Sequence, residues 1–232
     1  MALLSTQDQQ HIRHLFEEMA NPVRIVLFTA TTDCPYCDTT REIVEEVASL
    51  SSKLSVEQHD LKAEPAVASI YAVDRAPAIA LVQVGQDGVE SKDFGLRFYG
   101  IPSGYEFGTL LEDILMVSTG NPQLMPATKA WLSTLKKPVR LQVFVTPTCP
   151  YCPRMVSLAH KLAVASEHIR AEGVEASEFP VLAAKYGVQG VPRTVISVDG
   201  AADEHLVGAV PEADLLAALR KATGSKLIIA RA

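Results

Sequence analysis

Four cysteines account for most of the chemistry available to this 232-residue chain, and they fall in two identical tetrads. The tetrads are Cys34-Pro35-Tyr36-Cys37 and Cys149-Pro150-Tyr151-Cys152, and no isolated cysteine remains to bridge distant segments. Two cysteines three positions apart near a helix start can close and open a disulfide with each other. The spacing therefore favours local thiol chemistry over a structural disulfide framework.

The position of each tetrad, after a predicted strand and at the start of a predicted helix, indicates which sulfur reacts. Unsatisfied backbone N–H groups and the positive end of the helix dipole stabilise a thiolate at that position. Cys34 and Cys149 are therefore predicted to be the nucleophiles and the more exposed sulfurs. Cys37 and Cys152 are predicted to be the resolving thiols. The proline between them fits the first helical turn.

The chain repeats itself at an offset of 115 residues. The leading cysteines give 149 − 34 = 115, and Pro77 and Pro192 give 192 − 77 = 115. The residues between them agree at the same offset: Asp60 with Glu175, Pro65 with Pro180, Tyr71 with Tyr186 and Val73 with Val188. The offset changes only in predicted loops. The series predicts a duplicated unit, with a first copy over 1–120 and a second over 121–232.

Hydrophobic periodicity and turn residues predict the order α-β-α-β-α-β-β-α in each unit. In the first unit, helices are predicted over 6–20, from the first tetrad to about residue 50, over a short stretch that ends at 71, and over 103–117. Strands are predicted over 23–28, over a stretch that ends near 60, after 77 and over 94–99. An elongated hairpin turn is predicted between the last two strands. In the second unit, strands are predicted over 139–145, 169–175, 193–198 and 204–208. The fold class is α/β. The apolar segment 226–230 either docks on the surface or forms an ordered end.

Composition narrows the range of partners. The net charge of −6, without clustered Lys and Arg, argues against nucleic acid. The N-terminal residues lack the basic start and apolar core of a secretory signal, and no apolar run reaches the ~18 residues of a membrane span. We expect a cytoplasmic protein without a membrane partner.

The tetrads and two prolines downstream resemble those of a known family. Cys-Pro-Tyr-Cys is typical of glutaredoxins, and Ala76-Pro77 and Val191-Pro192 look like the cis-proline of the thioredoxin fold. Two such units with both tetrads intact resemble the protein disulfide oxidoreductases of thermophilic prokaryotes. The similarity covers nearly the whole chain.

The resemblance implies two tandem thioredoxin-like folds, each a central mixed sheet flanked by helices, and an enzyme that reduces, forms or isomerises disulfides in proteins. It implies redox-active disulfides without a cofactor or metal. The expected partners are protein disulfides or dithiols and a reductase such as a thioredoxin-reductase-like flavoprotein. The implied substrate-binding residues are Pro35, Tyr36, Ala76 and Pro77 at the first site and Pro150, Tyr151, Val191 and Pro192 at the second. The residue before each cis-proline would offer its backbone N–H and C=O to a substrate strand.

Two features depart from the thioredoxin pattern. Thioredoxins usually carry a buried acid six residues before the nucleophile, where this chain has Phe28 and Val143. The Trp that usually precedes the nucleophile is also replaced in both units. Asp60 and Glu175 are the nearest acids in the pattern. Each either transfers protons or ends its strand by capping the next helix.

Other interpretations stay open. A four-cysteine zinc ribbon needs pairs separated by about 15–20 residues, whereas here 149 − 37 = 112. A glutaredoxin-like iron–sulfur site is another alternative. A third is a dedicated reductant of one partner, such as a peroxiredoxin, as in the tandem thioredoxin-fold domain of alkyl hydroperoxide reductase flavoproteins. The six histidines are interpreted as surface or cap residues, and Trp131 as a packing residue.

The two tetrads have different neighbours. Asp33 and Asp38 flank the first, whereas Thr148 and Arg154 flank the second. Carboxylates disfavour a thiolate and a guanidinium favours it. We therefore predict that Cys149 has the lower pKa and is alkylated first near neutral pH.

Overall fold

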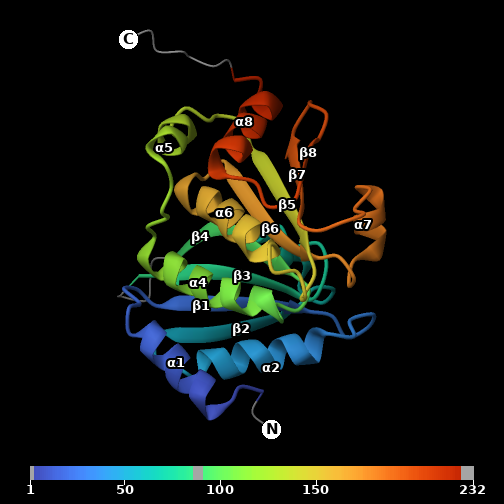
Figure 1. Cartoon of the computed structure of the whole chain (residues 1–232). Helices are drawn as coiled ribbons and strands as arrows, with labels where there is room; N and C mark the ends of the chain where they lie inside the picture. Colours follow the sequence, from blue (N-terminus) through green and yellow to red (C-terminus); the bar gives the residue numbers. More distant parts are fainter. Residues whose placement is uncertain (1–2, 86–90, 226–232) are drawn as a thin grey trace.

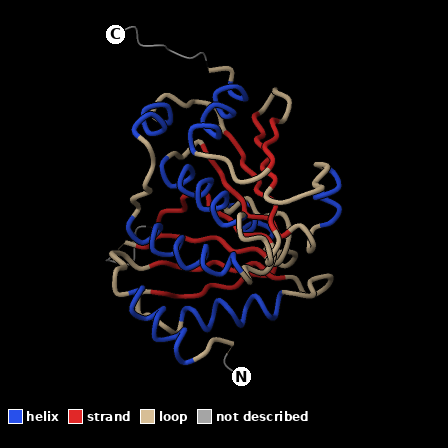
Figure 2. Tube along the Cα trace, viewed as in Figure 1, coloured by secondary structure: helices blue, strands red, loops and turns tan. Residues whose placement is uncertain are grey.

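A computed structural model describes residues 3–85 and 91–225 (Figure 1). In this part of the chain one eight-stranded sheet carries helices on both faces (Figure 2). The apolar segment 226–230 and the tip of the predicted hairpin lie outside the described residues. No helix of the described part is long and apolar enough to cross a bilayer.

The order α-β-α-β-α-β-β-α is present in both halves of the chain. The first half contains α1 (Thr6–Phe16), β1 (Val23–Thr29), α2 (Cys37–Ala48), β2 (Leu54–Asp60), α3 (Pro65–Ile70), β3 (Ala78–Val84), β4 (Ser91–Tyr99) and α4 (Tyr105–Thr119). The second contains α5 (Pro126–Leu132), β5 (Val139–Val145), α6 (Cys152–Ala165), β6 (Ile169–Glu175), α7 (Pro180–Lys185), β7 (Arg193–Val198), β8 (Glu204–Val207) and α8 (Glu212–Thr223). The predicted α/β class is confirmed.

The first helix is shorter than predicted. It ends at Phe16 rather than at residue 20, because the N–H groups of Glu17, Glu18 and Met19 bond to carbonyls three residues back instead of four. Met19 is nevertheless buried, as the helical pattern indicated.

The two halves share one sheet, in the order β2-β1-β3-β4-β6-β5-β7-β8. The halves meet where β4 pairs with β6 in parallel, with Leu96 opposite Ala171 and Tyr99 opposite Val174. Helices α1, α2, α4, α6 and α8 contribute to the larger core on one face, and α3 and α7 to a smaller core on the other. Because both faces are covered, β1 and β5 are buried along almost their whole length.

Strand direction places the two tetrads on the same side of the molecule. β1 is antiparallel to β3, β3 is antiparallel to β4, and β4, β6 and β5 are parallel, so β1 and β5 run in one direction. The loops that follow their carboxyl ends therefore lie at one edge of the sheet (Figure 1). Four strand spacings separate β1 from β5, which corresponds to about 19 Å across the sheet.

Candidate active site

Both cysteine pairs are disulfide-bonded. The Cα atoms are 5.4 Å apart for Cys34 and Cys37 and 5.5 Å apart for Cys149 and Cys152. In each pair the leading cysteine is the more exposed: Cys34 is partly exposed while Cys37 is 6% exposed, and Cys149 is 8% exposed while Cys152 is fully buried. The leading cysteine of each pair is therefore the one more open to a partner.

The helices begin later than the sequence predicted. α2 and α6 start at the resolving cysteines, and Pro35 and Pro150 lie in the turn ahead of the helix rather than in its first turn. The reason is a tight turn in which the N–H of each resolving cysteine donates to the carbonyl of the leading one, at 3.3 and 3.4 Å. The N–H of Ala30 also donates to the Cys37 sulfur at 3.3 Å.

The expected substrate-binding residues of the first site lie around one cavity. Both Ala76–Pro77 and Val191–Pro192 are cis peptide bonds. A cavity of about 340 Å³ beside the first disulfide is lined by Pro35, Tyr36, Ala76 and Pro77, together with residues from the second half of the chain. The first tetrad and the first cis-proline are thus brought together.

At the second site the tetrad and its proline differ in exposure. Val191 is partly buried and packs against both cores, and Pro192 is buried. Tyr151 is 62% exposed, more than its counterpart Tyr36 at 45%. Both tyrosines are therefore available to a partner.

Asp60 and Glu175 both accept hydrogen bonds from the backbone of the turn that follows their strand. The Asp60 carboxylate accepts the N–H groups of Lys62 and Ala63, each at 2.9 Å, and these bonds hold the pKa of Asp60 below its usual value despite some desolvation. Glu175 is buried and accepts the N–H of Glu178 at 2.6 Å. Both residues end their strands, as predicted, but neither caps the next helix, because the N-cap residues of α3 and α7 are Glu64 and Phe179. A role in proton transfer stays a prediction.

A different carboxylate, Glu106 of α4, lies next to the second site. The N–H of Tyr105 donates to the carbonyl of Pro147 at 3.1 Å, so α4 begins beside the loop that holds Cys149. Further along, Asp113 of α4 contacts His160 of α6. Glu106 precedes Asp113 by two helical turns, and both α4 and α6 begin near Pro147. We therefore infer that Glu106 lies toward the first turn of α6, where Cys152 is located.

Glu106 is buried without a strong partner. It is 4% exposed, and neither carboxylate oxygen has a hydrogen-bond partner among the described residues. Burial raises its pKa from 4.5 to about 7, against smaller opposing effects of Thr109 and His160. The sequence signal for this residue was a polar stripe in an otherwise apolar helix, formed by Glu106, Thr109 and Asp113.

The interpretation of every histidine as a surface or cap residue was wrong for His160. Its ring is fully buried, and Nδ1 lies 2.5 Å from Oδ2 of Asp113. The Phe98 ring packs edge-on against it, with ring centres 5.0 Å apart. The residue is internal because α4 of the first half covers this face of α6. His59 is half-buried between Glu57 and Glu64, and His11, His14 and His205 are exposed. Trp131 is buried in the core, as predicted.

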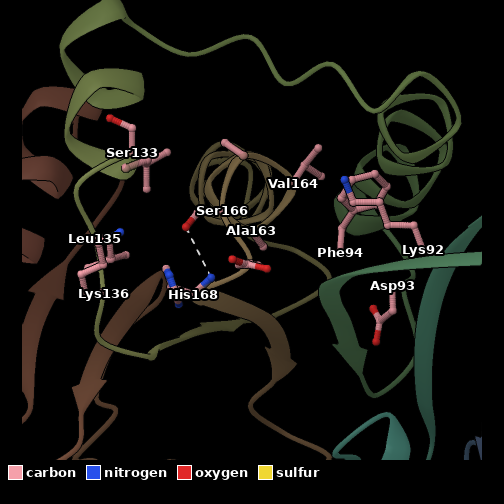
Figure 3. A pocket seen from close by; sticks show the side chains of 13 residues that line it. Lys92, Asp93, Phe94, Ser133, Leu135, Lys136, Ala163, Val164, Ser166 and His168 are labelled. Carbon is pink, nitrogen blue, oxygen red and sulfur yellow. Dashed lines mark hydrogen bonds between the residues drawn. The ribbon is translucent and has the colours of Figure 1, made fainter.

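The described residues show no preformed metal site, and a further cavity lies away from both disulfides. In the described ranges no group of three or more His, Cys, Asp or Glu residues is arranged to hold a metal ion. A cavity of about 430 Å³ lies at the opposite end of β4 and β6, between Phe94, Leu135, Ser166 and His168 (Figure 3).

Comparisons with known proteins agree with the fold and the cysteine pattern. Residues 139–221 match the family model described as a thioredoxin domain. A protein disulfide oxidoreductase from Aeropyrum pernix is 29% identical, with a TM-score of 0.81 over 97% of this chain and 96% of that one. The alkyl hydroperoxide reductase component AhpF from Enterococcus faecalis is 25% identical, with a TM-score of 0.81 over 93% of this chain and 99% of that chain.

Curated relatives are longer than this chain. The corresponding AhpF component of alkyl hydroperoxide reductase from Staphylococcus epidermidis is 25% identical over 177 residues, which cover 76% of this chain and 31% of that protein. The chain thus spans about a third of the length of this relative.

The fold and the two disulfides define a thiol–disulfide oxidoreductase built from thioredoxin-like folds. Over nearly its whole length it is similar to the protein disulfide oxidoreductase from Aeropyrum pernix.

Proposed function

We propose that both sites exchange disulfides with protein partners, without a bound cofactor. The observation that carries this proposal is the pair of identical Cys-Pro-Tyr-Cys disulfides at one edge of a single sheet, each with its leading cysteine more exposed than its resolving cysteine. An open surface site suits a macromolecular disulfide, because such a substrate need not be enclosed.

Reduction of a partner proceeds in two balanced steps. The Cys34 or Cys149 thiolate attacks a sulfur of the partner disulfide, which forms a mixed disulfide and releases one partner thiolate. The Cys37 or Cys152 thiolate then attacks the leading sulfur, which closes the internal disulfide and releases the second partner thiolate. The partner gains two electrons and the enzyme loses two. The reverse sequence forms a disulfide in the partner.

At the second site we propose that Glu106 accepts the proton of the resolving thiol. The Cys152 thiol must lose its proton before it attacks Cys149, and Cys152 is fully buried away from water. Glu106 faces the same helical turn, and its pKa of about 7 leaves a large fraction of the carboxylate ready to accept a proton near neutral pH. The first site has Phe28 at the position of the usual buried acid.

Reduction of insulin disulfides tests the proposal. Wild type, Cys34→Ser and Cys149→Ser are compared with dithiothreitol as the electron donor, together with the variant in which both leading cysteines are replaced. We expect each single variant to retain activity from the remaining site and the double variant to lose it. Full activity in the double variant would contradict the proposal.

A second candidate function is the dedicated reduction of one partner, such as a peroxiredoxin. The similarity to the AhpF component of alkyl hydroperoxide reductase favours this candidate. It predicts that a bacterial peroxiredoxin is reduced with a kcat/KM at least about a hundredfold above that for insulin, whereas a general oxidoreductase acts on both similarly. When either function runs as reduction of a partner, a cytoplasmic reductase, such as a thioredoxin-reductase-like flavoprotein, restores the dithiols.

A further inference from the structure

The groove beside the first disulfide is built partly by the other half of the chain. Its lining includes Leu61 and Pro77 from the first half, and Glu178 and Phe179 from the loop between β6 and α7 of the second. The β4–β6 pairing brings this loop to the first site. One wall of the first site is therefore supplied by the second unit.

The groove continues onto the surface of α7. A second cavity, of about 380 Å³, shares Arg75, Glu178 and Phe179 with the first and extends along Val181 and Leu182. Val181 is 84% exposed although its side chain is wholly apolar. A continuous path thus runs from the Cys34 turn to an uncovered apolar face of α7.

Arg75 forms a fixed platform in the middle of this path. Its guanidinium makes two hydrogen bonds to Asp74, at 2.8 and 2.7 Å, and lies 5.1 Å from the Tyr99 ring centre and 5.8 Å from that of Phe179. Because Asp74 takes up much of its hydrogen-bonding edge, the guanidinium presents mainly a flat face. Such a face suits an apolar or aromatic side chain.

The wall itself is held in place by the backbone. Oε1 of Glu178 accepts the N–H of Ile101 at 2.6 Å, and the N–H of Glu178 donates to Oε2 of Glu175 at 2.6 Å. Phe179 packs edge-on against Tyr99, with ring centres 6.3 Å apart. A groove held in this way requires little ordering when a partner binds.

The second site lacks the same platform. At the offset of 115, Arg75 corresponds to Gly190 and Lys62 to Ser177. No guanidinium therefore lies before the second cis-proline. The two sites, identical in their tetrads, differ in the surface that a partner meets.

We propose that the first site binds an apolar side chain of its protein partner, located a few residues from the reacting cysteine, in the groove formed by Arg75, Phe179 and Val181. The preference depends on Phe179 and Val181 of the second unit as well as on Arg75, and it is absent at the second site. This inference rests on the proposed function, because the occupant is a protein disulfide.

The test uses the full chain with Cys149→Ser and Cys152→Ser, which leaves only the first site active. Two synthetic peptides, each with one internal disulfide, differ only by Leu or Ser at the positions two to four residues from one cysteine. We expect kcat/KM to be about five- to tenfold higher for the Leu peptide, as partial burial of one apolar side chain would give. In Val181→Ser and Phe179→Ala the ratio of kcat/KM for the Leu peptide to that for the Ser peptide should fall toward one.

Controls separate this inference from the underlying function. Val207→Ser, on the distant strand β8, removes an apolar side chain that is 68% exposed and should leave the ratio unchanged. Reduction of the small disulfide 5,5′-dithiobis(2-nitrobenzoate) should be equal in all variants. Equal kcat/KM for the two peptides, or a ratio that persists in Val181→Ser and Phe179→Ala, would overturn the inference. Loss of small-disulfide reduction by the first-site parent would instead refute thiol exchange at that site.

Discussion

Asp113 of α4 and His160 of α6 form a buried pair between the two units, with Oδ2 and Nδ1 2.5 Å apart and side chains 1% and 0% exposed. The pair links a helix of the first half to the helix that carries Cys152. Burial raises the pKa of Asp113, and His160 opposes this effect. Each group therefore depends on the other to remain buried.

Replacing one member of this pair should destabilise the protein strongly. His160→Leu leaves the Asp113 carboxylate buried without its partner, which should lower the free energy of unfolding by about 3–5 kcal/mol. Asp113→Leu should have a comparable effect, and the double variant should lose much less than the sum. Urea unfolding of the four proteins measures the coupling. Additive losses would show that the two side chains act independently.

Glu106→Gln should slow the second site selectively. In a background of Cys34→Ser and Cys37→Ser, we expect a loss of about tenfold or more in the rate at which Cys152 resolves the mixed disulfide, because the proton acceptor is removed. The parent rate should also rise with pH through about 7, where Glu106 ionises, and the variant should lack this limb. The same substitution with only the first site active is the matched control, and equal slowing there would contradict the assignment.

Glu106→Gln should also change stability with pH. The pKa is about 7 in the folded protein and 4.5 when the group is exposed, so between these values the folded state holds more protons and loses stability as pH rises. The total loss approaches about 3 kcal/mol above pH 7. The neutral amide lacks this term. The free energy of unfolding of the variant, measured relative to the parent, should therefore rise between pH 5 and pH 8. A difference in unfolding free energy that does not change with pH would argue against a buried titrating carboxyl.

Gly104 should tolerate no side chain. Its φ of +59° disfavours other residues, and an added Cβ would overlap the carbonyl oxygen of Pro147, just before Cys149. Gly187 has a φ of +60° with open space around it, so Gly187→Ala reports the backbone cost alone, about 1 kcal/mol. Gly104→Ala should cost at least about 2 kcal/mol more in thermal unfolding. Similar losses of stability in the two variants would mean that the contact between the start of α4 and Pro147 can shift to accommodate the added Cβ.

The charge around the two tetrads should separate the leading thiols. In fully reduced protein, mass spectrometry of alkylation against pH should give a lower midpoint for Cys149 than for Cys34, and Arg154→Met should lower the Cys149 rate at pH 7 about two- to threefold. Asp38 pairs with Arg41 at 3.1 Å, which leaves Asp33 as the other acid flanking the first tetrad. A lower midpoint for Cys34 would reverse the predicted order.

Local features were predictable from the sequence, and contacts between the units were not. β5, β6 and β7 have the bounds predicted from their β-branched runs and turn residues. Nothing in a strand's own residues indicates which strand of another unit it joins, so the β4–β6 pairing was not foreseen. His160, Glu106 and Phe179 all owe their surroundings to that pairing or to α4 packing on α6.

The β4–β6 pairing also hides two strand edges. In an isolated first half, β4 would expose the unpaired N–H and C=O groups that now meet β6, and in an isolated second half β6 would expose the matching row. Open edges of this kind recruit other chains into intermolecular sheets. Separately expressed halves should therefore aggregate or pair with each other, so that co-expression rescues the solubility that each half lacks alone.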